Sequence, residues 1–212
     1  MSEPKKFRRP AMLAQGVAED LPGGVDPALT SDLAHSSAEA LVARARYQAP
    51  DDPDLVKRLI GLVETEGVEA VAMLWAQAPA ESLPGALWRV YMLREWVRRD
   101  PEVVADRYRQ GMARQEVADA VAGAAHPPGP AEMRELANAV LSGVFTGELD
   151  VALDRAAAFA RIVATGAALD ADHLEPTQPA VAGQVTRGAS SLTSTADALA
   201  RAAAKWRAGT LD

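Results

Sequence analysis

The chain has 212 residues, a formal net charge of −7 from 22 Lys plus Arg against 29 Asp plus Glu, and no cysteine. The lack of cysteine excludes a disulfide framework, a Cys-ligated metal site and a cysteine nucleophile within these residues. The excess of negative charge disfavours nucleic acid as a partner, because phosphate is bound by positive surface.

The composition predicts an all-α fold. Alanine, leucine, arginine and glutamate, which are strong helix formers, dominate the chain, and runs with the period-two pattern of strands are nearly absent. We expect a bundle of about eight helices. No apolar run approaches the ~18 residues of a membrane-spanning helix and no signal peptide is apparent, so we expect a cytoplasmic protein without a membrane partner. No cofactor is implied.

Four segments follow from the distribution of proline, glycine and charge. Residues 1–24 read as a disordered basic tail with Lys5, Lys6, Arg8 and Arg9, although such a run can also act as an arm for an acidic partner. Residues 25–125 read as a helical body. Residues 126–130 hold three prolines and a glycine and predict a hinge. Residues 131–212 read as a helical hairpin followed by a long Ala-rich helix.

Helix starts are marked by Asp-Pro pairs at residues 26, 52 and 100, where aspartate is the N-cap and proline the first helical residue. A nearly all-apolar helix is predicted at 68–78 and another helix at 83–97, with a further short helix at 115–125. After the hinge, helices at 131–144 and 147–165 are expected to form an antiparallel hairpin. An acidic loop is expected at 166–180 and a last helix at 182–208.

The helix at 83–97 has two apolar stripes at helical spacing. Leu83, Leu87 and Val90 belong to the main stripe, and the second comprises Trp88, Met92 and Trp96 on the opposite side. A helix with two apolar stripes contacts neighbours on both sides. The second stripe therefore faces either the interior of the domain or a partner subunit.

Arg94 falls inside the main apolar stripe, where an unpaired charge is costly. One interpretation is an anion or ligand site in a helical pocket, assisted by Arg89, Tyr91 and Arg98. The other is an internal ion pair with a carboxylate such as Glu102 or Asp106, since arginine is the usual choice for buried pairing. The second interpretation is favoured.

A divalent-cation site is a further hypothesis for the acidic segment near residue 172. Asp170, Asp172, His173 and Glu175 supply carboxylates and an imidazole at high density. Their spacing matches no EF-hand and no helix-borne ligand pair, and an acidic surface loop explains them equally well. Gly-x-Ser-x-Gly and phosphate-loop motifs are absent, and a helix-turn-helix pattern at 115–121 runs into the Pro-rich hinge.

The run from Leu83 to Glu102, LPGALWRVYMLREWVRRDPE, resembles a segment found in small all-helical proteins of high-GC actinobacteria. That group has no established activity. The resemblance covers about a tenth of the chain, agrees with an all-α fold and transfers no functional residue.

The leading functional hypothesis is a non-enzymatic interaction or regulatory protein that works through helix faces and self-associates, because a helix buries an apolar stripe readily against a copy of itself. A nucleic-acid-associated or transcription-associated protein using the Arg-rich stretch 88–114 is the first alternative, and a small-molecule or anion binder around Arg94 is the second. An enzyme is the least favoured class, although sites built from Asp, Glu and Arg leave no readable motif.

Overall fold

The computed structural model describes residues 26–45, 67–114, 128–141 and 147–212. Most of them are helical and no strand occurs among them, which confirms the all-α prediction. Seven helices lie in these ranges, against about eight expected for the chain. The expected helices beginning at residues 52 and 115, and the basic tail, fall outside the described residues. The helices are α2 (Pro27–Ala45), α4 (Val68–Leu74), α5 (Leu83–Arg99), α6 (Pro101–Arg114), α7 (Pro130–Leu141), α8 (Leu149–Leu174) and α9 (Pro179–Arg207).

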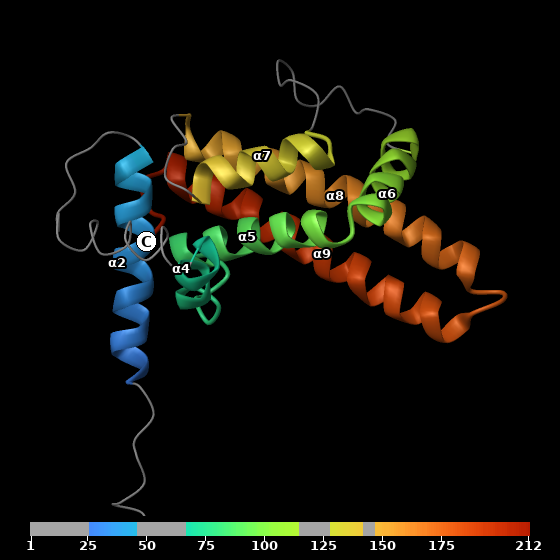
Figure 1. The fold of residues 1–212 in the computed structure, drawn as a ribbon, viewed down its shortest axis with the longest axis horizontal. Coiled ribbons are helices and arrows are strands. Elements are labelled where there is room, and N and C mark those ends of the chain that lie inside the picture. The colour runs from blue at the N-terminus through green and yellow to red at the C-terminus, as the bar shows by residue number, and fades with distance from the viewer. Residues whose placement is uncertain (1–25, 46–66, 115–127, 142–146) are drawn as a thin grey trace, which may run out of the picture.

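The two longest helices, α8 and α9, form an antiparallel hairpin (Figure 1). Their facing sides are rich in alanine, including Ala156, Ala160, Ala196 and Ala203, which are fully buried and allow the two backbones to approach closely. The expected loop at 166–180 is wrong, because α8 continues to Leu174 and only a short turn precedes α9. Helix α7 also contacts α8, but the segment 142–146 between them lies outside the described residues, so the expected hairpin between 131–144 and 147–165 stays a prediction.

The remaining helices pack on the hairpin and on one another. Helix α5 lies beside α9 and is surrounded by α2, α4, α6 and α7 (Figure 1). The largest fully buried side chains include Trp75, Leu87, Phe159 and Leu199, which belong to one core cluster. That cluster contains residues from both sides of the Pro-rich segment 126–130. None of the helices in the described ranges is long and apolar enough to cross a membrane.

Helices α6 and α8 cross at a contact made by two glycines. A Cβ on Gly111 would lie 1.9 Å from the carbonyl oxygen of Ile162, and one on Gly166 would lie 1.9 Å from that of Arg107. Only a residue without a side chain allows backbones to come this close. Next to the crossing, Arg107 Nε donates to Asp170 Oδ2 at 2.8 Å and fixes the relative position of the helices.

The start of α5 is tied to the end of the chain. Ser82 is the N-cap of α5, and its Oγ accepts from the N–H of Gly85 at 3.3 Å. The backbone oxygen of Asp212 accepts from the N–H of Leu83 at 2.5 Å. Glu81 pairs with Arg201 at 2.9 Å and with Lys205 at 3.2 Å. These contacts hold the last turns of α9 against the first turn of α5.

Candidate functional site

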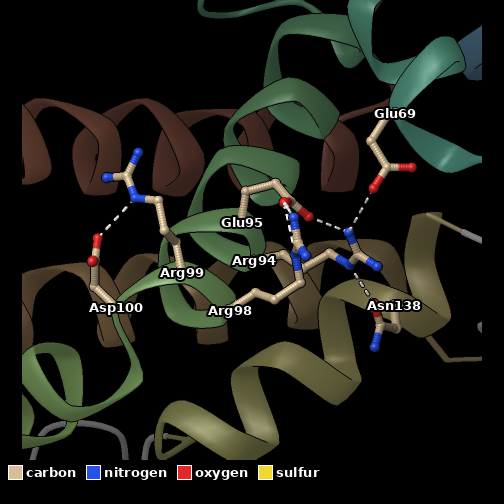
Figure 2. A network of polar contacts seen from close by, with 7 residues as sticks. All are labelled: Glu69, Arg94, Glu95, Arg98, Arg99, Asp100 and Asn138. Carbon is tan, nitrogen blue, oxygen red and sulfur yellow. Dashed lines mark hydrogen bonds and ion pairs between the residues drawn. The ribbon is translucent and has the colours of Figure 1, made fainter.

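Arg94 lies between three helices, with its side chain 17% exposed (Figure 2). Its Nη1 donates to Glu95 on the same helix, α5, and lies 3.8 Å from Glu69 Oε1 on α4. Its Nε donates to Asn138 Oδ1 on α7. The guanidinium therefore connects α4, α5 and α7. The carboxylates named from the sequence as its partners, Glu102 and Asp106, are not the ones that pair with it.

The surroundings of Arg94 balance its charge. Arg98 Nη2 lies 2.7 Å from Glu95 Oε2, so that Glu95 sits between two guanidinium groups (Figure 2). With Glu69 nearby, the cluster holds two arginines and two glutamates. The hydrogen bond from Arg98 to Glu95 is the main reason that the pKa of Arg98 is raised. An incoming anion would have to compete with carboxylates already bonded to both guanidinium groups.

Tyr91 borders this cluster from one turn earlier on α5. Its ring is stacked on that of Trp88, with centroids 5.4 Å apart, and the residue is buried. Burial, followed by the charges of Glu95 and Glu69, raises the pKa of the Tyr91 phenol, so it stays neutral near pH 7.

Arg89 does not join the Arg94 cluster. Its Nη1 donates to the carbonyl oxygen of Gly85 at 2.8 Å, one turn back along α5. Burial lowers the pKa of Arg89, because the charged guanidinium loses hydration there. Of the four residues proposed for the anion site, the structure therefore brings together Arg94, Arg98 and Tyr91.

Three further arginines of the Arg-rich stretch 88–114 form ion pairs with carboxylates. Arg99 pairs with Asp100 at 2.9 Å, and Arg109 pairs with Asp106 at 2.8 Å. Arg107 pairs across helices with Asp170 at 2.8 Å. Paired guanidinium groups leave less positive charge for phosphate, so these three arginines resemble those of a solvated, ion-paired face.

The second stripe of α5 lies on the side of the helix away from the main stripe. Met92 is 47% exposed at its centre. Trp88 and Trp96, one turn before and one turn after, are partly buried and pack against the core. We call these three residues the α5 strip. It combines contact with the interior and exposure to solvent. The contact of Trp88 and Trp96 with the core agrees with the first sequence-based interpretation, and a partner subunit at this stripe stays a prediction.

The four residues proposed for a metal site are not gathered. Asp170 accepts hydrogen bonds from Arg107 at 2.8 Å and from Gln110 at 3.0 Å. Asp172, His173 and Glu175 are exposed, on the last turn of α8 and at its C-cap. Asp172 and Glu175 are three residues apart and share a helix face, whereas His173 is rotated by about 100° from Asp172. In the described ranges, no group of three His, Cys, Asp or Glu residues could hold a metal ion.

An open cavity of about 620 Å³ lies where α8 begins and α9 ends. Asp150, in the first turn of α8, is 13% exposed at its side chain, and Arg207 Nη1 lies 3.4 Å from its Oδ2. The same Nη1 donates to Asp154 at 2.7 Å. No pattern in the sequence indicates this cavity, because its lining residues lie in two segments more than fifty residues apart along the chain. The lining residues are Glu148, Asp150, Trp206, Arg207, Gly209 and Leu211.

Because comparison with known proteins finds no match, a function is argued from the geometry of the Arg94 cluster, the α5 strip and the cavity. The chain matches no protein-family model, no curated protein and no solved structure.

Proposed function

We propose that the protein is a non-enzymatic helical interaction protein that associates with a second copy of itself through the α5 strip. The observation that carries the proposal is the exposure of Met92, 47%, on a helix that is otherwise largely buried. Trp88 and Trp96 on either side extend the apolar surface toward the core.

The chemistry of the α5 strip is that of an interface centre. Methionine and tryptophan are enriched in interfaces, and tryptophan is prominent among the residues that dominate binding energy. Burying an exposed methionine side chain contributes about 1.5–3 kcal/mol. A second copy is the simplest partner, because a two-fold interface uses the same patch on both subunits.

The Arg94 cluster supports a structural role for the polar residues next to the strip. Its charges are balanced, and its hydrogen bonds run to α5 and α7, with Glu69 of α4 close by. Such a cluster fixes the orientation of α5 against its neighbours. A rigid α5 presents the strip in one geometry, which lowers the entropy lost on association.

Light scattering on a concentration series tests the proposal. We expect wild-type protein to gain mass toward a dimer as its concentration rises, and Met92→Asp to stay monomeric because a charge is placed at the interface centre. Val103→Asp is the matched control, since Val103 on α6 is also 47% exposed. A wild-type protein that stays monomeric at millimolar concentration contradicts the proposal, and so does an equal loss of mass in both variants.

A further inference from the structure

The cavity between the start of α8 and the end of α9 carries more negative than positive charge. Arg207 is its one lining cation among the described residues, and it is shared by Asp150 and Asp154. The pKa of Arg207 is raised, chiefly by the hydrogen bond to Asp154. Arg207 Nη1 lies 3.4 Å from Asp150 Oδ2 but only 2.7 Å from Asp154 Oδ2, so Asp150 is the more weakly paired of the two carboxylates. Glu148 adds a further carboxylate to the wall.

The end of α9 and the residues after it add two apolar side chains to the cavity lining, beside Arg207. Leu211 and Trp206 are partly buried and pack against the core. The chain turns at Gly209 with φ of +67°, and no atom lies within 4 Å of where its Cβ would be. A volume of about 620 Å³ lies within the ~300–1,000 Å³ typical of small-molecule sites.

The arrangement of the carboxylates decides between two kinds of cation. A divalent metal ion needs several oxygen ligands within about 2.6 Å of one point. In the part of the chain that the structure describes, no three acidic or histidine side chains meet that requirement. Two carboxylates from the start of α8 and two apolar side chains from the end of the chain suit an extended cation with an apolar body.

We propose that this cavity binds an organic ammonium ion that carries an aliphatic chain. The ammonium group donates a hydrogen bond to Asp150, which it shares with Arg207, and its chain lies along Leu211 and the Trp206 ring. Glu148, at the same end of α8, adds negative charge near the ammonium group. A free alkylamine and the side chain of a lysine present the same chemistry. The site is separate from the α5 strip, so the inference does not depend on self-association.

NMR of the four tryptophan indole N–H groups tests the site directly. Hexylammonium chloride is titrated into the full chain, with hexanol as the neutral probe of the same length. We expect hexylammonium to give a saturable shift of the Trp206 signal, with the buried Trp75 signal unmoved, and hexanol to bind at least tenfold more weakly. Equal binding of the two probes, or no saturable shift at millimolar hexylammonium, overturns the proposal.

Variants of single carboxylates identify the negative charge that binds the ammonium group. Glu148→Gln and Asp150→Asn are each expected to weaken hexylammonium binding by about tenfold, equivalent to 1.4 kcal/mol. Glu175→Gln, an exposed carboxylate at the opposite end of α8, is expected to leave it unchanged. Equal weakening in all three variants indicates attraction to the net charge alone and overturns the proposal.

Tighter binding of Nα-acetyl-lysine methylamide than of hexylammonium assigns the site to a lysine side chain, and the reverse order assigns it to a free amine.

Discussion

Ser37 and Trp75 join α2 to α4 through a buried hydrogen bond, in which the indole Nε1 donates to the serine Oγ at 3.0 Å. Both residues are 0% exposed. The Ser37 hydroxyl in turn donates to the carbonyl oxygen of Ala34 at 2.9 Å. This is a polar contact inside an apolar core, and it fixes how the two helices meet.

Removing the Ser37 hydroxyl leaves the buried indole N–H of Trp75 without a hydrogen-bond acceptor. We expect Ser37→Ala to lower the free energy of unfolding by about 1–3 kcal/mol, because the Trp75 indole loses its acceptor without regaining water. Urea denaturation followed by circular dichroism measures the change. Ser36→Ala, at the neighbouring exposed position, is expected to change stability by less than about 0.5 kcal/mol. Indistinguishable midpoints for the two variants would contradict this reading of the contact.

The contact between α6 and α8 at Gly111 and Gly166 has no space for an added methyl group. Gly166→Ala places a Cβ 1.9 Å from the carbonyl oxygen of Arg107, so the helices must separate and the protein is destabilised by at least about 1–3 kcal/mol. Gly188→Ala on α9 meets nothing within 4 Å and is expected to stabilise by about 0.5–1 kcal/mol. Thermal melting measures both, and shifts of the same sign would show that the helices do not pack this closely.

Arg94 is expected to contribute to stability through its three helices. Arg94→Met leaves the mostly buried Glu95 without one of its two guanidinium partners, and we expect a loss of about 1–3 kcal/mol, less than for a fully buried pair. Arg99→Met is the control, since Arg99 is 78% exposed and pairs with its neighbour Asp100; its effect is expected to stay within about 0.5 kcal/mol. A neutral Arg94→Met variant, together with a melting temperature of the wild type that rises specifically with phosphate, would favour an anion site instead.

Glu81 gives the contact between α5 and α9 a defined pH dependence. Hydrogen bonds from Lys205 and Arg201 are the main causes that lower the pKa of Glu81 below its ordinary 4.5. A carboxyl whose pKa is lowered in the folded state stabilises the fold above its unfolded pKa, and this contribution disappears as the pH falls through the folded value. The melting temperature of the wild type minus that of Glu81→Gln is therefore expected to be constant above about pH 6 and to shrink below pH 4.5. A difference that grows on acidification would contradict the assignment.

Local signals in the sequence located the starts of two of the seven described helices. The Asp-Pro pairs at residues 26 and 100 lie where α2 and α6 begin. A helix start depends on residues within one turn of it, so it can be predicted from the local sequence.

The errors arose where contacts between distant segments decide the structure. The glycine and acidic residues at 166–180 predict a loop, whereas α8 continues through Gly166 to Leu174 and the missing side chain of Gly166 lets α6 approach closely. Arg94 was correctly expected to favour an ion pair, but its partners Glu69 and Glu95 depend on how α4 packs against α5. The cavity lined by Glu148 and Arg207 was missed for the same reason.

The most direct test of the central claim uses the absence of cysteine from the sequence. Met92→Cys and Val103→Cys each give a protein with one thiol at an equally exposed position. Mild oxidation at micromolar concentration, read on a non-reducing gel, is expected to yield a disulfide-linked dimer for Met92→Cys and mainly monomer for Val103→Cys, since a disulfide needs Cα atoms within about 7 Å. Equal cross-linking of the two variants, or none at position 92, would contradict self-association through the α5 strip.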